Sequence, residues 1–212
     1  MKIVIDQGHG GRDPGASGNG LAEADLTGQL GLIVKEKLAG YDAEVEFAPR
    51  GSLNERAAFA NNAGADLFVS IHINAGGGTG YESHIYIGAA TTTLTIAKSV
   101  HTILSAWYAE RGFRDRGLKQ SNFAVLRETK MPAVLLENLF IDRAEDAAFL
   151  KDNLPDIGNE IAWAIAQAVG LKAKKIDPCE NCQEIVKLRT QIQLMKQEMK
   201  QISGVCSKYV AM

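Results

Sequence analysis

The sequence predicts an α/β protein, a twisted and largely parallel sheet flanked by helices, with a C-terminal coiled-coil helix after it. Short apolar segments alternate with helical patterns along the first 171 residues, which is typical of a sheet covered by helices. The segment 66–72 is apolar almost without interruption, as expected of a strand covered on both faces. After residue 183, apolar residues recur every three or four positions, which is the pattern of a coiled coil.

The first element is a short buried strand at residues 2–6, followed by a glycine-rich stretch at 8–20. We expect this stretch to be a loop rather than a helix or strand. Long loops in compact domains are usually functional, so it is a candidate site. A helix follows at residues 23–38, where apolar residues recur with a helical period until Gly40.

The remaining elements of the body continue the alternation of strands and helices. Ser52 and Glu55 have the spacing of a capping box, which predicts a helix from there to about residue 63. The further expected strands are 43–48, 66–72, 82–87 and 133–137, and the further expected helices are 92–111, 143–150 and 155–169.

Three chemically capable side chains lie where predicted strands end. His9 follows the first strand, His72 closes the third, and Glu137 closes the last. Ligands of such sheets bind at the carboxyl edge of the strands, so we expect these three residues to meet at one edge.

Two histidines and one carboxylate are a common ligand set for a catalytic zinc ion, with the fourth position left for water. His9 is flanked by glycines that let the backbone approach closely and expose the ring, and His72 lies between a buried strand and the glycine run 76–78. The carboxylate should come from the start of the first helix, where Glu23 is the first choice and Asp25 its rival on spacing.

The other two histidines have simpler interpretations. A lone histidine is more often a hydrogen-bonded structural residue than a ligand. His84 falls inside a predicted strand and His101 inside a predicted helix, so we assign both a structural or surface role.

Four sequence blocks carry a resemblance to a known family. They are GHGGRDPGASGNGLAEADL, APRGSLNERAAFAN, SIHINA and PAVLLENLFI. Together they resemble the zinc-dependent N-acetylmuramoyl-L-alanine amidases of the amidase-3 type, over about residues 1–169. The resemblance implies that His9, Glu23 and His72 bind Zn²⁺ and that Glu137 is the catalytic glutamate.

The activity implied is hydrolysis of the amide between N-acetylmuramic acid and L-alanine in peptidoglycan. Glu137 would take a proton from the attacking water and return it to the leaving amine. Two positions depart from the family pattern: Gln7 replaces a usual proline, and Leu139 stands where glycine is usual. Arg50 and Arg56 are interpreted as structural residues or contacts to the stem peptide.

Two alternative functions stay open at this stage. The chain could be a zinc peptidase that cuts within the stem peptide, or a wall-binding module that has lost catalysis. The presence of both the ligand set and Glu137 argues against the wall-binding module, and the released products would separate the amidase from the peptidase.

The segment beyond the body predicts an oligomer. We divide the chain into a catalytic domain (1–171), a linker (172–182) and a coiled-coil oligomerisation segment (183–212). Homo-oligomerisation through this C-terminal helix is the first interpretation, and packing on the body the second. Cys179, Cys182 and Cys206 could bind metal or form disulfides. The apolar stripe consists of Ile185, Leu188, Ile192, Met195, Met199, Ile202, Cys206 and Tyr209.

Charge and hydropathy limit the partners. A formal net charge of −2 argues against a nucleic-acid coat protein. No apolar run approaches the about 20 residues of a membrane span. No secretory signal precedes the first strand, so we expect synthesis in the host cytoplasm and action on the cell wall after release. These features resemble a bacteriophage endolysin, although a cytoplasmic or mother-cell bacterial amidase would look the same.

Overall fold

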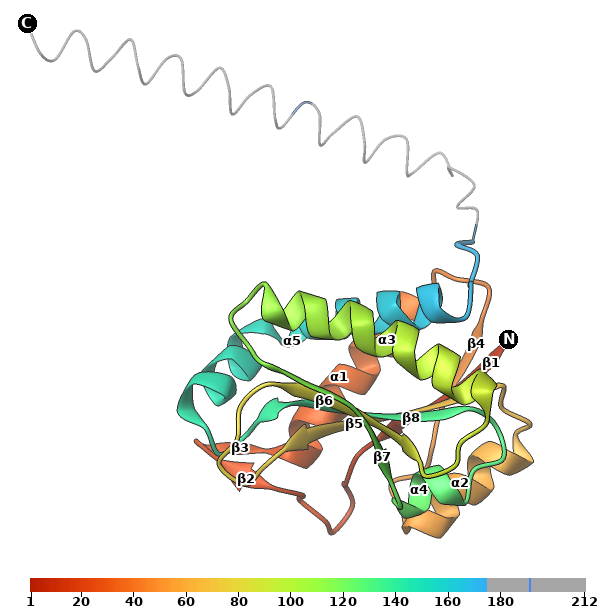
Figure 1. Cartoon of the computed structure of the whole chain (residues 1–212), viewed down its shortest axis with the longest axis horizontal. Helices are drawn as coiled ribbons and strands as arrows, with labels where there is room; N and C mark the ends of the chain where they lie inside the picture. The colour runs from red at the N-terminus through yellow and green to blue at the C-terminus, as the bar shows by residue number, and fades with distance from the viewer. Residues whose placement is uncertain (175–190, 192–212) are drawn as a thin grey trace, which may run out of the picture. The chain divides into compact units, whose positions relative to one another are not determined.

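A six-stranded mixed sheet between two helical layers forms the body of the protein in the computed structural model (Figure 1). The structure describes residues 1–174 and Gln191. Apart from Gln191, the predicted coiled-coil segment lies outside the described residues, as do the three cysteines. The strands, in their order across the sheet, are β4 (Glu44–Phe47), β1 (Lys2–Gln7), β5 (Leu67–Asn74), β8 (Ala133–Phe140), β6 (Tyr81–Tyr86) and β7 (Asp115–Ser121).

Four adjacent strands, β4, β1, β5 and β8, run parallel, and β6 is antiparallel to β8. The outermost strand, β7, is parallel to β6. The prediction of a largely parallel sheet flanked by helices is therefore confirmed. The parallel strands place their carboxyl ends at one edge, and the start of β6 lies at that same edge because its direction is reversed.

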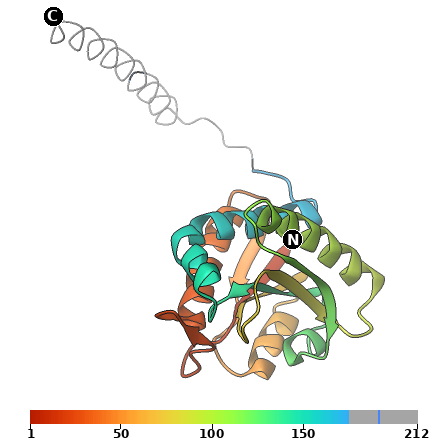
Figure 2. The same ribbon diagram turned by 60° about the vertical axis from the view of Figure 1, so that its left-hand side comes forward.

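The helices cover the two faces unequally (Figure 2). One face packs against α1 (Glu23–Leu38), α3 (Thr91–Ala109) and α5 (Ala144–Ala168), which enclose the larger hydrophobic core. The other face carries α2 (Leu53–Asn62) and α4 (Ala124–Arg127) over a smaller core that includes Phe68 and Leu135. This second face leaves part of the sheet free for a site.

The predicted boundaries agree closely with the structure in several elements. The helix α1 has the expected bounds, with Leu30, Val34 and Leu38 fully buried against the sheet. The predicted capping box is present, because Ser52 Oγ accepts from the Glu55 backbone while the Glu55 carboxylate accepts from the Ser52 backbone. The two helices expected near residues 143–150 and 155–169 form the single element α5, interrupted by non-helical backbone at Asn153 just before Pro155.

Other features were not predicted. The edge strand β7 has the polar sequence DRGLKQS, and an exposed edge strand with charged side chains carries no hydrophobic alternation. The glycine-rich stretch, expected to be loop only, contains β2 (Ser17–Gly18), which pairs with β3 (Leu21–Ala22) as a small hairpin. Its remainder is a loop as expected.

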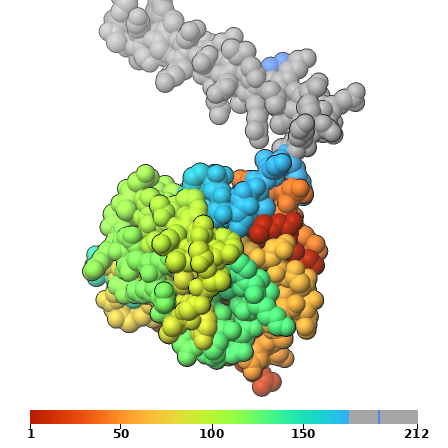
Figure 3. All heavy atoms as spheres, turned by 45° about the vertical axis from the view of Figure 1, so that its right-hand side comes forward, coloured from red at the N-terminus to blue at the C-terminus, as the bar shows by residue number. Residues whose placement is uncertain are grey.

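The last described stretch of the body pairs with the loop between α1 and β4. The backbone of Lys174 donates to Gly40, and that of Asp42 donates to Lys172. Figure 3 shows the start of the chain (red) beside this last described stretch of the body (blue). No helix within residues 1–174 is long and apolar enough to cross a membrane.

Candidate metal centre and catalytic carboxylate

The loop after β1 and the start of α1 bring His9 and Glu23 together at the carboxyl edge of the sheet. His9 adopts a left-handed backbone conformation, with φ of 61°, which turns the loop back over the strand ends. Gly15 packs against both residues. A Cβ at this glycine would lie 2.7 Å from Glu23 Oε2 and 2.7 Å from the His9 ring, so a larger residue would displace them.

Glu23 bridges the two histidines. Its Oε2 lies 3.2 Å from His9 Nε2, and its Oε1 lies 3.0 Å from His72 Nδ1. The backbone N–H groups of Ala16 and Ile73 donate to the same carboxylate, each at 3.0 Å. One ligand atom from each of the three residues lies within 4.8 Å of the others, a spacing that can hold a metal ion.

The structure places the rival carboxylate differently. Asp25 is exposed and does not belong to the cluster, whereas Glu23 is buried at 3% exposure. Successive side chains of a helix point about 100° apart. The side chain of Asp25, two positions after Glu23, therefore faces away from the histidines.

The orientation of His9 is set by Asp13. Asp13 Oδ2 lies 2.7 Å from His9 Nδ1, which leaves Nε2 directed at Glu23. A carboxylate on the far nitrogen of a metal-binding histidine is a common supporting contact. The spacing His9-x-x-x-Asp13 within the loop was the only sequence signal of this contact.

The charges in the cluster are strongly coupled. The hydrogen bond with Glu23 raises the pKa of His9 to about 9, against the effect of burial. Burial by itself would raise the pKa of Glu23, but the hydrogen bonds with His72 and His9 outweigh it and hold that pKa well below its ordinary range. The site therefore keeps a buried negative charge facing two imidazoles, and a cation would satisfy it in place of a proton.

Glu137 lies directly beside this cluster. It is the register partner of His72 in the β5–β8 pair, so the two side chains project from the same face on neighbouring strands. Burial raises the pKa of Glu137 to about 7. Its Oε2 is buried and has no hydrogen-bond partner among the described residues.

A cavity of about 290 Å³ opens next to Glu137 and His72. Its other walls are mainly apolar and come from the start of α2 and the segment around α4. They include the exposed side chains of Leu53 and Phe123. This cavity would bring a substrate next to the Glu137 side chain.

The loop that carries His9 is held from below by a buried arginine. Arg56 donates to the carbonyl oxygens of Gln7 and His9, at 2.9 and 2.7 Å, and forms an ion pair with Asp6 at 2.7 Å. Ser70 donates to the second oxygen of Asp6. These contacts support a structural role for Arg56, because its guanidinium group is bonded to the loop and to Asp6.

Arg50 supports the same loop from the other side. Its Nη2 donates to the carbonyl oxygen of Ala24 at 2.6 Å, next to Glu23. Its aliphatic stem packs under Gly10, where an added Cβ would come within 2.5 Å of Arg50 Cδ. The two arginines thus hold the backbone on both sides of the cluster of candidate metal ligands.

The departure from the family pattern at Leu139 has a structural consequence. Leu139 adopts φ of 65°, a conformation that favours glycine, and its side chain is fully buried. The preceding Asn138 donates to the carbonyl oxygen of His72 and accepts from the Tyr108 hydroxyl. Core packing and these hydrogen bonds hold a backbone turn that glycine would adopt without strain.

The two remaining histidines are not part of the His9–Glu23–His72 cluster. His84 contacts Ser121 and Glu82, and His101 lies between Ser83 and Asp115. Burial lowers the pKa of both, which favours neutral structural rings.

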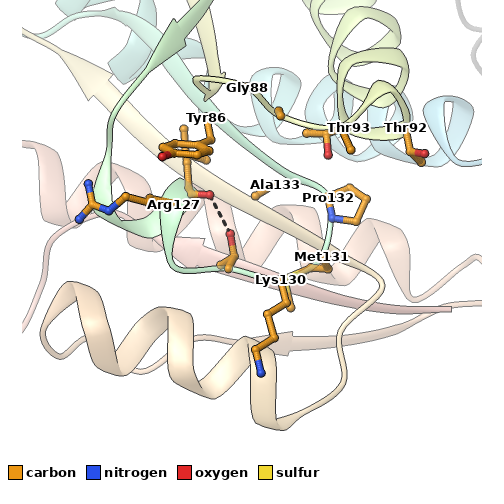
Figure 4. A pocket seen from close by; sticks show the side chains of 13 residues that line it. Tyr86, Gly88, Thr92, Thr93, Arg127, Lys130, Met131, Pro132 and Ala133 are labelled. Carbon is orange, nitrogen blue, oxygen red and sulfur yellow. Dashed lines mark hydrogen bonds between the residues drawn. The ribbon is translucent and has the colours of Figure 1, made fainter.

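Figure 4 shows a different cavity, of about 430 Å³, beneath the start of α3. It is lined by Tyr86, Arg127 and Lys130, among others, and by Ala133 at the beginning of β8. This is the opposite edge of the sheet from Glu137, and no histidine or carboxylate lines it.

Known proteins resemble this chain in sequence and in fold. Residues 3–170 match the amidase-3 type family model, described as N-acetylmuramoyl-L-alanine amidase. The chain is 47% identical over 182 residues to a sporulation-specific N-acetylmuramoyl-L-alanine amidase of Bacillus subtilis, covering 81% of this chain and 69% of the relative. It is 41% identical over 182 residues to the endolysin of Bacillus phage SPP1, covering 81% and 67%. Among solved structures, an N-acetylmuramoyl-L-alanine amidase from Clostridium difficile 630 superposes with a TM-score of 0.72 at 32% identity, covering 79% of this chain and 94% of that one.

Proposed function

Because the chain belongs to the N-acetylmuramoyl-L-alanine amidase family, we propose that it hydrolyses the amide between N-acetylmuramic acid and L-alanine in peptidoglycan. The observation that carries the proposal is the pairing of the His9–Glu23–His72 cluster with Glu137 on the adjacent strand. Hydrolysis of an amide by water needs both a group that polarises the carbonyl and a base that takes the proton of the water.

We assign His9, Glu23 and His72 as the ligands of a zinc ion. Two imidazole nitrogens and one carboxylate match the donor set of catalytic zinc sites. The orphaned Oε2 of Glu137 beside them also fits, since it would accept from a water at the open position. When bound, zinc would polarise the substrate carbonyl and lower the pKa of a water to about 7.

Glu137 is assigned as the general base and general acid. Its carboxylate takes a proton from the attacking water and transfers it to the nitrogen of L-alanine as the amide bond breaks. Burial raises the pKa of Glu137 to about 7, which suits a group that must both accept and release a proton near neutral pH. Asp13 contacts the His9 ring and Arg56 its carbonyl oxygen, and both keep His9 in place.

The test is digestion of purified peptidoglycan with and without a chelator, followed by mass spectrometry of the new ends. We expect stem peptides with a free L-alanine amino group and muramic acid with a free lactyl carboxylate. Both products should be lost on chelation and return when zinc is added.

Other outcomes would support the alternatives. Amino acids released from within the stem would indicate a zinc peptidase. Binding to peptidoglycan without any cleavage, by protein that has bound zinc, would indicate a wall-binding module.

We propose two biological settings for this activity. The similarity to a phage endolysin favours a role in lysis of the host wall after the protein is released from the cytoplasm. The sporulation-specific relative supports the second candidate, a bacterial amidase of the mother cell.

For the C-terminal segment we propose homo-oligomerisation. Its apolar residues follow a heptad pattern for nearly four repeats, with lysine, glutamine and glutamate between them. A helix with such a narrow apolar stripe is stable only against a partner. Several catalytic domains joined in this way would bind a polymeric wall more tightly than one.

Sedimentation velocity of the full chain tests this proposal. We expect an oligomer for the wild type and a monomer for the double variant Ile192→Asp, Met195→Asp, because charges in the stripe prevent pairing. The matched control is Gln193→Asp with Lys196→Asp, outside the stripe, which should remain oligomeric. A monomeric wild-type chain would contradict the proposal.

A further inference from the structure

We propose that Arg116 and Lys119 on β7 form a binding site for a carboxylate of the stem peptide, and that this carboxylate belongs to its second residue. The inference rests on the proposed amidase function and names the part of the substrate that the enzyme selects. A row of polar side chains crosses the sheet at the edge that carries Glu137.

The row begins at the candidate metal ligand His72 and runs over the neighbouring strands β5, β8 and β6. His72 on β5 is the register partner of Glu137 on β8, and Glu137 is the register partner of Glu82 on β6. Register partners project from the same face, and neighbouring strands lie about 4.8 Å apart. Glu82 therefore lies about one strand beyond Glu137, on the side away from the metal ligands.

Glu82 is a buried carboxylate that forms ion pairs with two cationic side chains. It is 6% exposed, and its Oε2 accepts from Arg116 Nε at 2.6 Å and from Lys119 Nζ at 2.5 Å. Its Oε1 accepts from Asn74 and lies 3.2 Å from His84 Nε2. Both oxygens of Glu82 are thus fully used by the protein.

The cluster of Glu82, Arg116 and Lys119 has more cations than carboxylates. Within residues 1–174, Glu82 is the only carboxylate in ion-pair distance of either Arg116 or Lys119. His84 adds no negative charge, and burial lowers its pKa. One carboxylate against two cations leaves a net charge of +1 beside the catalytic glutamate.

The two cations are also directed outward. The side chains of Arg116 and Lys119 are 28% and 40% exposed, respectively. Arg116 uses only Nε towards Glu82 and rests over the Phe140 ring at 4.8 Å, so in the described part of the chain its Nη atoms have no acceptor. A held guanidinium with free N–H groups is well suited to a carboxylate.

The position of these cations indicates which carboxylate of the substrate they would bind. Glu137 donates its proton to the leaving amine, so we place the stem peptide beyond Glu137, on the side away from the metal ligands, over β6 and β7. The second stem residue is glutamate or its amide, with the α-carboxyl group two residues from the scissile nitrogen. Two extended residues span about 7 Å, which reaches past β6, about 4.8 Å from β8, to where the side chains of Arg116 and Lys119 extend from β7 towards Glu82.

The test compares two synthetic substrates, N-acetylmuramoyl-L-alanyl-D-isoglutamate and the corresponding D-isoglutamine, which differ only in that α-carboxyl group. For the wild type we expect kcat/KM to be about tenfold higher for the carboxylate, the size of one charge-assisted hydrogen bond. In Lys119→Met the ratio of the two kcat/KM values should fall to near one. Arg116→Gln should lower the ratio in the same direction.

The matched control is Lys98→Met, an exposed lysine on α3, which should keep the wild-type ratio. Equal kcat/KM for the two substrates in the wild type would overturn the inference. So would a Lys119→Met or Arg116→Gln variant that is folded by circular dichroism and loses activity equally on both, since that indicates a structural ion pair. Failure to cleave either substrate, while natural peptidoglycan is also left intact, would instead contradict the amidase function.

Discussion

Glu137→Gln is expected to lower kcat by about a thousandfold while zinc stays bound, because the variant keeps the shape of the side chain and loses the proton acceptor. Measurement of kcat on a muramyl peptide, together with zinc content by atomic absorption, checks both parts. The expected KM is close to that of the wild type, since Glu137 acts on the water and the leaving group. Loss of zinc from the folded variant would make Glu137 a ligand and contradict its assignment.

The same residue predicts a pH dependence. Glu137 must be ionised to accept a proton, so kcat/KM should rise with pH through its pKa. Burial raises that pKa from 4.5 to about 7 without metal, and a nearby cation would lower it, so the acid limb should lie between these values. A rate that is independent of pH from 4 to 8 would argue against this role.

The stability of the metal-free protein provides an independent check on Glu137. A carboxyl group whose pKa is raised by folding binds more protons in the folded state, so its ionisation costs stability as the pH rises from 4.5 to about 7. Glu137→Gln removes this cost. At pH 8 we expect the free energy of unfolding of the metal-free variant to exceed that of the wild type by about 1–3 kcal/mol.

Glu23→Gln is expected to weaken zinc binding by more than about a hundredfold and to abolish activity with it. Glutamine keeps the size of the side chain but removes the buried charge that faces both imidazoles. Without that charge the pKa of His9 should fall from about 9 towards its ordinary value of 6.5, which NMR titration of the metal-free protein would detect.

Asp25→Asn is the matched control for Glu23→Gln. Asp25 is an acidic residue of the same helix, two positions away, and it is exposed. This variant should bind zinc and cleave peptidoglycan as the wild type does. If Asp25→Asn lost zinc while Glu23→Gln kept it, the assignment of the carboxylate ligand would be reversed.

Several parts of this site could be predicted from the sequence because each has a local signal. His9 follows an apolar strand and is flanked by glycines, His72 closes an apolar strand, and parallel strands bring their ends to one edge. Glu23 could be chosen only together with Asp25 as a rival, because spacing places both near the start of α1. The fold then separated them, with Glu23 buried between the rings and Asp25 exposed.

The contacts of the arginines could not be predicted in the same way. Arg56 lies on α2, a helix whose pattern shows only which side is apolar. The carbonyl groups of Gln7 and His9 come within its reach because α2 packs beneath the end of β1. A long-range contact of this kind depends on the placement of two elements, and neither segment alone carries a signal for it.

The sequence by itself determined the alternation of strands and helices, the capping box of α2 and the residues able to bind a metal, since hydrophobic period and residue chemistry are local properties. Only the tertiary structure decided that the polar segment 115–121 joins the sheet as β7 beside β6. Edge strands are stabilised by pairing with a neighbour and can be charged on their exposed side, so their sequence need not show a pattern. Register between strands that are distant in the chain then placed Arg116 and Lys119 next to Glu82, one strand beyond Glu137.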